Sequence, residues 1–251
     1  MITFVGAGPG APDLITLRGH HALTQADIVI YAGSLVNPKL LEDTKPGCQI
    51  YNSAHMTLEQ VLEVMKKDSE KGLEIVRLHT GDPCIYGAIR EQMDQLDELG
   101  LPYEVVPGVS SFLGAAAALK AEFTLPDVSQ TVILTRMEGR TPVPETESIQ
   151  SLASHKATMV IFLSAGMLEE LSQRLIEGGY DPDTPAAIVY KATWPEEKVI
   201  PTTVRGLAQA AQEQNVSKTA LILEGGFLGQ DYSRSKLYDP GFSHEFREAT
   251  R

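Results

Sequence analysis

Three short glycine-containing segments hold the residue types best suited to binding a small ligand. They read Gly6-Ala-Gly-Pro-Gly10, Gly81-Asp-Pro83 and Pro107-Gly-Val-Ser-Ser111. Each directly follows an apolar run typical of a β-strand and precedes a run typical of a helix. In open α/β sheets, small ligands bind outside the carboxyl ends of the strands. We therefore expect the three segments to line one ligand cleft.

The first segment is compatible with three roles. Its Gly6-x-Gly8 spacing after a strand is typical of a dinucleotide-binding turn, but Pro9 removes a backbone N–H that would cradle phosphate. The stretch Leu14-Ile-Thr16 delays the helix, and Asp27 precedes the second strand instead of ending it, where a ribose-binding acid belongs. A structural turn is the second possibility. We favour the third, in which the segment forms a backbone wall of a substrate cleft.

The other two segments also have a structural and a functional interpretation. Gly81 allows a close backbone approach, and Asp82 could either cap the next helix or contact a ligand. Ser110 or Ser111 could likewise cap a helix that begins near Phe112, or bind the polar end of a ligand.

The elements around these segments alternate between strands and helices in the first half of the chain, which predicts a parallel sheet covered on both faces. The expected strands are Ile2–Val5, Ile28–Tyr31, Gln49–Tyr51, Glu74–Leu78 and Tyr103–Val106. The expected helices are Leu17–Gln25, Leu58–Lys71, Ile89–Leu99 and Ser111–Lys120. Thr57-Leu-Glu-Gln60 resembles a capping box at one helix start.

The pattern begins again after Leu125-Pro-Asp127, so we predict two lobes, residues 1–120 and 121–251. The second should contain strands at Thr131–Thr135, Thr158–Leu163, Ala187–Tyr190, Lys198–Thr203 and Ala220–Leu223. Its helices should be Met167–Glu177 and Val204–Gln214, and residues 138–147 read as a loop. The predicted fold is α/β, with two α/β lobes and a ligand cleft between them.

The composition favours a cytoplasmic protein without a nucleic-acid or membrane partner. The 33 Asp and Glu residues outnumber the 21 Lys and Arg residues, and no dense basic run is present for phosphate contacts. No apolar run approaches the roughly 18 residues of a membrane span. The two cysteines, Cys48 and Cys84, form neither a disulfide framework nor a metal-binding spacing, so no protein-bound metal is expected. The cations placed near loops are Arg18, Lys39, Arg77, Arg90, Lys120, Arg136, Arg140 and Lys191.

The three segments, in this order, resemble the tetrapyrrole methyltransferase family, and the resemblance covers nearly the whole chain. Within the family, several stretches are similar to the members that methylate C11 of precorrin-4 or cobalt-precorrin-4. These stretches are Tyr31-Ala-Gly-Ser-Leu-Val-Asn-Pro38, Leu78-His-Thr-Gly-Asp-Pro83, Ser129-Gln-Thr-Val-Ile-Leu-Thr-Arg136 followed by Glu138-Gly-Arg140, and Tyr190-Lys-Ala-Thr-Trp-Pro195.

The resemblance implies a homodimer that binds S-adenosylmethionine as methyl donor and a tetrapyrrole of corrin biosynthesis as substrate. It implies donor contacts at Pro9, Thr80, Gly81, Asp82, Ile85, Tyr86, Ser110, Ser111, Leu163, Ser164 and Ala187. It implies that the first segment faces the tetrapyrrole, with substrate contacts at Gly6, Gly8, Pro9, Gly10, Asp13 and Ser34. Relatives that methylate uroporphyrinogen III carry an Arg where this chain has Ala88, which favours a different tetrapyrrole.

Transfer from a sulfonium needs neither a metal nor a covalent nucleophile, because the donor already activates the methyl group. Asp82 could pair with the positive sulfonium and is the one candidate for a catalytic role. A base could remove a ring proton afterwards, and the candidates by position are Asp13, His20, His21 and His79.

The alternative functions to C11 methylation are uroporphyrinogen-III methylation, a nicotinamide-dependent oxidoreductase built on the first segment, and a non-catalytic tetrapyrrole carrier.

Overall fold

The computed structural model describes residues 1–33 and 35–250. Two compact units are present. Unit 1 contains Met1–Ala115 together with Lys191–Glu197, and unit 2 contains Ala116–Tyr190 and the chain from Lys198 onward. The lobes that we predict from the sequence divide after residue 120, whereas these units divide at Ala115 and group Lys191–Glu197 with the first unit.

Unit 1 is built on a five-stranded sheet in the order β3-β2-β4-β1-β5, in which every pair of neighbouring strands is parallel. The strands are β1 (Ile2–Gly6), β2 (Ile28–Tyr31), β3 (Gln49–Asn52), β4 (Ile75–His79) and β5 (Tyr103–Val106). The helices are α1 (Leu17–Gln25), α2 (Leu58–Ser69), α3 (Arg90–Glu98) and α4 (Ser111–Leu119), the last of which continues into unit 2. The predicted parallel sheet is confirmed.

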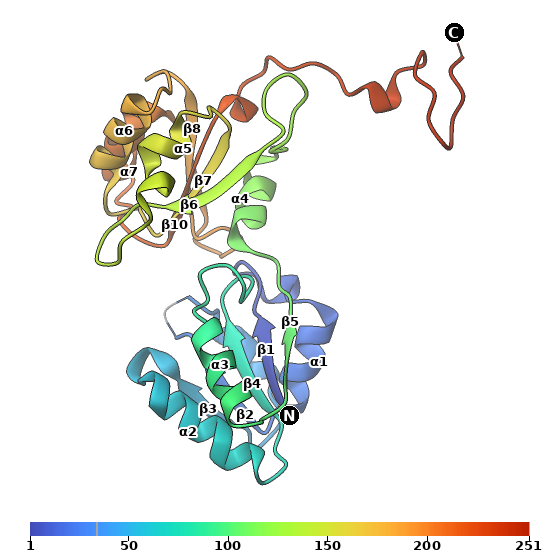
Figure 1. Ribbon diagram of the computed structural model, residues 1–251, viewed down its shortest axis with the longest axis vertical. Coiled ribbons are helices and arrows are strands. Elements are labelled where there is room, and N and C mark those ends of the chain that lie inside the picture. The colour runs from blue at the N-terminus through green and yellow to red at the C-terminus, as the bar shows by residue number, and fades with distance from the viewer. Residues whose placement is uncertain (34, 251) are drawn as a thin grey trace. The chain divides into compact units, whose positions relative to one another are not determined.

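Helices cover both faces of this sheet because its central strands are apolar on both sides. Alternate strand residues such as Phe4 and Ile30 pack against Met65 of α2 and Leu96 of α3. Their neighbours, including Val5, pack against α1 on the opposite face. Figure 1 shows α2 and α3 on one side of the sheet and α1 on the other.

The helix starts follow the capping chemistry of the sequence. Thr57 and Gln60 form the predicted capping box at the start of α2, with the Thr57 hydroxyl accepting from the Gln60 N–H. At the start of α1, the Thr16 side chain accepts a hydrogen bond from the Gly19 N–H. A 3₁₀ turn at Pro12–Leu14 precedes this helix, so the delay that the sequence predicts between the first glycine segment and α1 is confirmed.

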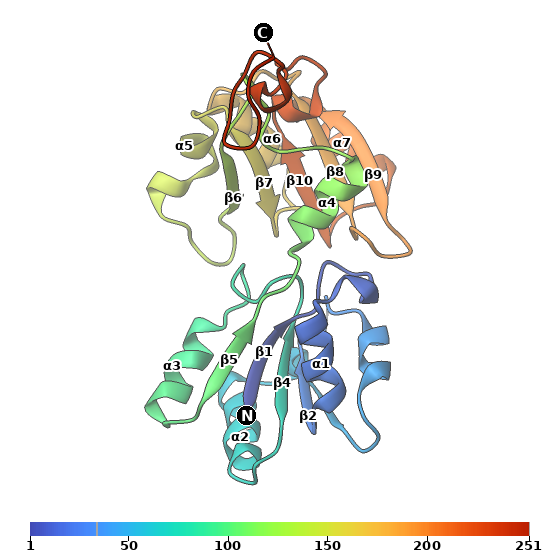
Figure 2. The same cartoon turned by 90° about the vertical axis from the view of Figure 1, so that its right-hand side faces the viewer.

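Unit 2 contains a mixed five-stranded sheet in the order β6-β7-β10-β8-β9, which Figure 2 shows strand by strand. Only β6 and β7 are parallel, and the other neighbouring strands are antiparallel. The strands are β6 (Val132–Arg136), β7 (Thr158–Phe162), β8 (Pro185–Tyr190), β9 (Lys198–Thr203) and β10 (Ala220–Glu224). Strands β8 and β9 follow each other without a helix between them, which allows the antiparallel pairing.

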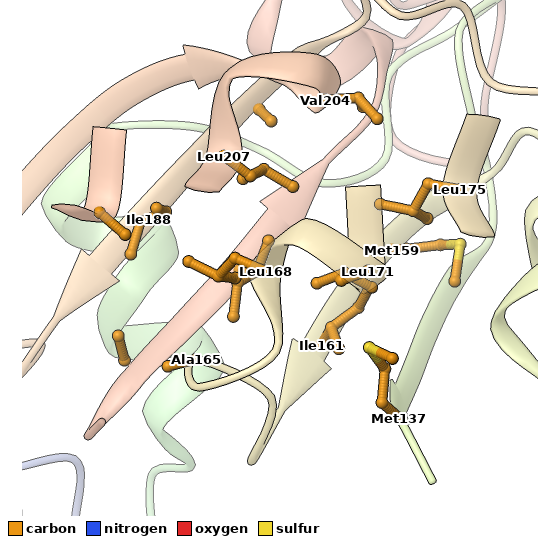
Figure 3. Packing of buried hydrophobic residues seen from close by; sticks show 14 of the residues in the cluster. Met137, Met159, Ile161, Ala165, Leu168, Leu171, Leu175, Ile188, Val204 and Leu207 are labelled. Carbon is orange, nitrogen blue, oxygen red and sulfur yellow. The ribbon is translucent and has the colours of Figure 1, made fainter. Parts of the chain in front are cut away.

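The core of unit 2 fills the space between this sheet and three helices, α5 (Ile149–Ala153), α6 (Leu168–Glu177) and α7 (Leu207–Glu213). Leu168 and Leu171 of α6 pack onto Ile161 of β7 and the neighbouring strands, as Figure 3 shows. The sequence predicts α6 and α7 but not α5. This short helix follows a 3₁₀ turn at Glu145–Glu147, and the turn lies within residues 138–147, which we read as a loop.

A carboxyl side chain lies inside this core. Glu224 at the end of β10 has no solvent exposure, and neither of its carboxylate oxygens has a hydrogen-bond partner among the described residues. Burial raises the pKa of Glu224 well above its usual value. Burial, followed by the nearby Glu224 carboxyl, also raises the pKa of Tyr180, whose hydroxyl donates to the Ala157 carbonyl. Both side chains are therefore neutral near pH 7.

We predict that Glu224→Met stabilises the protein, and that its advantage over the wild type grows as the pH rises. The folded state keeps Glu224 protonated, whereas the unfolded state loses this proton above its ordinary pKa near 4.5, so rising pH favours unfolding of the wild type. The advantage should increase by up to about 1.4 kcal/mol per pH unit between pH 4.5 and the raised pKa of the folded state. Urea denaturation between pH 5 and 8 measures the difference in free energy of unfolding between the variant and the wild type. Glu169→Met, at an exposed site, is the control. A pH-independent difference would contradict the prediction.

Candidate functional site

The three glycine segments meet at one edge of the unit 1 sheet. They follow β1, β4 and β5, which are neighbours in the sheet. The Gly8 N–H donates to the Gly81 carbonyl at 3.3 Å, and the Gly81 N–H donates to the Gly8 carbonyl at 2.8 Å. The structure thus brings the segments together, and the ligand cleft that we expect them to line stays a prediction.

This edge is also where the chain reverses its direction of travel across the sheet. From β1 the chain passes through α1 to β2 on one side, and from β4 it passes through α3 to β5 on the other. β1 and β4 are neighbours whose connections run in opposite directions across the sheet, and such switch points are the usual ligand sites of open α/β sheets. The topology therefore favours a ligand site at the Gly6–Gly10 and Gly81–Pro83 segments.

The three backbones approach so closely that side chains would not fit between them. A Cβ at Gly6 would lie 2.5 Å from the Gly108 Cα and 2.6 Å from the Gly81 carbonyl oxygen, and a Cβ at Gly108 would overlap that oxygen. Gly81 also has φ of +59°, a conformation that other residues rarely adopt.

Asp82 joins the second segment to the third. One carboxylate oxygen accepts from the Gly108 N–H at 2.8 Å, and the other accepts from the Cys84 N–H at 2.8 Å within its own turn. Each oxygen of Asp82 thus already accepts a backbone hydrogen bond. Asp82 does not cap α3, which begins at Arg90 after the N-cap residue Ile89 and has no side-chain cap. The carboxylate positions the two loops relative to each other.

The remaining predicted donor residues of unit 1 surround this turn. The Thr80 hydroxyl donates to the Leu35 carbonyl at 3.1 Å. Ser110 is buried, and its Cα would lie 3.3 Å from a Cβ at Gly81. Ser111 is the first residue of α4, Ile85 is half-buried and Tyr86 is 47% exposed with φ of +56°. The structure therefore brings Thr80, Gly81, Asp82, Ser110 and Ser111 together.

The predicted donor residues of unit 2 lie in different parts of its sheet. Leu163 follows β7 directly, is 65% exposed and has φ of +53°. Ser164 is buried, with its hydroxyl donating to the Phe162 carbonyl and accepting from the Met137 N–H. Ala187 lies within β8, 1% exposed, between Leu223 and Pro201 of the neighbouring strands. Their role in donor binding stays a prediction.

The first glycine segment is more enclosed than a cleft wall would be. Gly6, Gly8, Pro9 and Gly10 are all buried, whereas Asp13 is exposed. Ser34 lies outside the described residues. Side chains that the sequence did not identify as site residues cover the segment: Asn37 donates to the Gly10 carbonyl at 2.8 Å, and Trp194 packs against Gly10. Substrate contact by this segment stays a prediction.

The geometry does not support nucleotide binding by the first segment. Pro9 has no N–H, and α1 begins only at Leu17, after the 3₁₀ turn. Asp27, the residue that would have to bind a ribose, instead accepts from the Glu74 N–H at 2.8 Å and pairs with Lys45. Its pKa is lowered by the hydrogen bond from Lys45 and then by that from Glu74.

Among the four candidate bases, His79 is buried at the end of β4, and its Nε2 has no hydrogen-bond partner among the described residues. Burial, with Arg77 nearby, lowers the pKa of His79 to about 3, so it is a poor proton acceptor near pH 7. The Nε2 atom of His20 lies 3.3 Å from a carboxylate oxygen of Asp43. His21 and Asp13 are exposed.

Several of the predicted loop cations have structural partners. Arg77 donates to Gln92 and to the Ile30 carbonyl inside the sheet, and burial lowers its pKa to about 10. Arg136 donates to three backbone carbonyls of the loop after β6.

Within residues 1–33 and 35–250, no cluster of three or more His, Cys, Asp or Glu side chains could hold a metal ion.

Comparison with known proteins identifies the family. Residues 1–208 match the family model of the tetrapyrrole (corrin/porphyrin) methylases. The chain belongs to this family. A relative from Methanocaldococcus jannaschii, a cobalt-precorrin-4 C(11)-methyltransferase, is 52% identical over 99% of this chain and 96% of its own.

Solved structures of the same family share the fold. The X-ray structure of a cobalt precorrin-4 methyltransferase, CbiF, superposes with a TM-score of 0.89 at 48% identity, over 91% of this chain and 96% of its own. A uroporphyrin-III C-methyltransferase from Thermus thermophilus, complexed with S-adenyl homocysteine, superposes with a TM-score of 0.76 at 26% identity. The match covers 91% of this chain and 93% of that chain. The predicted fold and family are thus confirmed, and an oxidoreductase has no support.

We predict that Gly108→Ala destabilises the protein by about 1–3 kcal/mol, because the added methyl group overlaps the Gly81 carbonyl and forces the segments apart. Gly139→Ala is the matched control, since its Cβ would lie 3.9 Å from the nearest atom, Met167 Cε. Neither position has the left-handed backbone that would add strain. Urea denaturation compares the two variants, and equal midpoints would show that the close approach is not a stability constraint.

Proposed function

We propose that this protein transfers a methyl group from S-adenosylmethionine to C11 of precorrin-4 or cobalt-precorrin-4. The observation that carries this proposal is the 52% identity over 99% of the chain to a cobalt-precorrin-4 C(11)-methyltransferase. The CbiF structure supports the same substrate class. The more distant uroporphyrin-III enzyme, at 26% identity, supports the alternative substrate less strongly.

The donor binds, in this proposal, at the switch point formed by the carboxyl ends of β1 and β4. The uroporphyrin-III enzyme of Thermus thermophilus forms a crystalline complex with S-adenyl homocysteine, the product of the donor, which supports this donor for the family. Thr80, Gly81, Asp82, Ser110 and Ser111 lie together at this edge of the sheet. Ile85 and Tyr86 follow in the same turn.

The charge of this turn suits a sulfonium donor. Between His79 and Ile89, Asp82 is the only side chain that is charged near pH 7, because burial keeps His79 neutral. Burial, and then the charge of Asp82, raises the pKa of the Cys84 thiol, so that it also remains protonated. A single negative charge would favour a positively charged sulfonium over a neutral thioether product.

The reaction is an in-line displacement in which the new bond joins the methyl carbon to the ring carbon as the carbon–sulfur bond breaks. The electron pair of that bond leaves with sulfur, and the substrate loses a proton. Holding the two reactants in a near-attack geometry supplies up to roughly 7–11 kcal/mol of the barrier reduction in such reactions. In this proposal, the three joined loops hold the donor in place for the attack.

The cellular setting belongs to the same proposal. We expect a homodimer in the cytoplasm, with neither nucleic acid nor membrane as a partner. The net charge of −12 disfavours binding to phosphate backbones. In the described part of the chain, every helix is too short or too polar to cross a membrane.

Anaerobic incubation with S-adenosylmethionine and cobalt-precorrin-4 tests the reaction. We expect mass spectrometry to show the gain of one methyl group, and NMR to place it at C11. Parallel reactions with metal-free precorrin-4 and uroporphyrinogen III identify the preferred substrate. Methylation of uroporphyrinogen III alone would replace the proposed substrate. Tetrapyrrole binding without methylation, in the presence of bound donor, would indicate a carrier.

We also predict that S-adenosylhomocysteine protects Cys84 from alkylation. Cys84 is exposed in the proposed donor turn, and a ligand at ten times its Kd should slow the reaction about tenfold if it blocks access. Iodoacetamide at pH 8.5 compensates for the raised thiol pKa, and peptide mass spectrometry separates the two cysteines. Cys48 is the internal control and should react equally with and without ligand. Equal rates at Cys84 would place the donor elsewhere.

A further inference from the structure

We propose that Trp194 is a positioning residue that holds the end of the first glycine segment, Gly10 and the adjoining Ala11, in the shape required for tetrapyrrole binding. This inference rests on the proposed function, because it takes the tetrapyrrole as the molecule that this segment serves. Trp194 lies in Lys191–Glu197, the connection between β8 and β9 that groups with unit 1. No role at the site follows for this residue from the sequence alone.

The indole of Trp194 lies directly on Gly10. A Cβ at Gly10 would overlap the Cδ1 and Nε1 atoms of the indole and would lie 2.9 Å from the Ala192 carbonyl oxygen. Gly10 also has φ of +159°, at the upper limit of the range of positive φ that residues with a side chain rarely adopt. The absence of a side chain at Gly10 therefore allows the indole to pack against the backbone of the segment.

Other contacts fix the same segment from three sides. The Ala11 N–H donates to the Thr193 hydroxyl at 2.9 Å. The Asn37 amide, which is buried, donates to the Gly10 carbonyl at 2.8 Å. A Cβ at Gly114 of α4 would lie 2.9 Å from the Pro9 ring, so that helix also approaches the segment closely. Because Trp194 and Thr193 contact consecutive residues, Lys191–Glu197 determines how the end of the segment is held.

The connection that carries Trp194 is itself held in an unfavourable backbone conformation. Lys191 has φ of +46° and Thr193 has φ of +68°, which is a costly conformation for a β-branched residue. The Glu197 carboxylate accepts from the Thr193 N–H at 2.6 Å, and the Lys191 ammonium lies 5.2 Å from the centroid of the indole. Strained backbone of this kind persists only where surrounding contacts impose it, and it concentrates at functional sites.

The donor turn has separate supports. Gly8 and Gly81 exchange two backbone hydrogen bonds, and Asp82 accepts from the Gly108 N–H. Neither contact includes Trp194 or Thr193. Removal of the indole should therefore release the Gly10–Ala11 end of the segment and leave the donor turn in place. This predicts a selective effect on the tetrapyrrole.

The test compares Trp194→Ala and Trp194→Phe with wild type. For Trp194→Ala we expect the KM for cobalt-precorrin-4 to rise at least about tenfold, because its binding surface is no longer pre-organised. The Kd for S-adenosylhomocysteine, measured by calorimetry, should stay within threefold. Trp194→Phe retains an aromatic face against Gly10 and should restore most of the loss. Val199→Ala, on neighbouring β9, is the control and should behave as wild type.

The single tryptophan of the chain gives a readout that needs no substrate. In Gly10→Ala, the added methyl group should displace the indole, so that acrylamide quenches its fluorescence more strongly and the emission shifts to longer wavelength. Gly10→Ala should also reproduce the rise in KM. Unchanged quenching would contradict the packing on which the proposal rests.

The outcomes separate this inference from the proposed function. If wild type methylates cobalt-precorrin-4 but Trp194→Ala has the same KM, the positioning role is wrong and the function stands. If donor and tetrapyrrole affinities fall together in Trp194→Ala, the residue is a general structural support, which also overturns the inference. A wild-type protein that binds donor and methylates no tetrapyrrole would overturn the proposed function, and this inference with it.

Discussion

The contact of three backbone segments without intervening side chains is the constraint on which the rest of unit 1 depends. Gly6, Gly81 and Gly108 belong to loops that follow three neighbouring strands, and each Cα faces another loop's backbone. Such an approach is possible only if β4, β1 and β5 end at the same level in the sheet. The parallel registers of these strands ensure this, because Gly6 is paired with His79 and Val5 with Val106.

The apolar packing on both faces of the sheet keeps these strand ends fixed. Val5 and Leu78 are buried on the face of α1, and Phe4 and Ile75 are buried on the face of α2 and α3. A one-residue slip of β1 would exchange its two sets of side chains between the faces, so the register is strongly specified. Hydrophobic burial in the sheet therefore maintains the strand register that the glycine contacts require. The loops add only the hydrogen bonds that close the edge.

The sequence was sufficient for most of unit 1 because its periodicity, capping residues and glycine positions all indicate the same βα units. Strand β2 and helix α1 have the predicted bounds, and the Thr57 capping box is present. It was less informative for unit 2, where short apolar strands do not reveal whether neighbours run parallel or antiparallel. The packing of the Lys191–Glu197 connection is the clearest omission, because the resemblance included Tyr190–Pro195 but gave Trp194 no role. Its packing onto Gly10 joins residues distant in the chain, and no local pattern encodes such a contact.

Burial also decides the chemistry that the site can perform, in a way that residue types alone did not show. A histidine beside a glycine turn suggests a base, yet His79 stacks against Phe4 with their ring centroids 6.2 Å apart and has a pKa of about 3. Asp82, the one candidate for a catalytic role, already accepts hydrogen bonds from two backbone N–H groups. The edge of the sheet thus offers an acidic side chain that is fixed by backbone hydrogen bonds, and a histidine whose pKa burial lowers too far for proton transfer near pH 7. Such a site suits a reaction in which a cationic donor must be held and oriented, since positioning then contributes more than proton transfer.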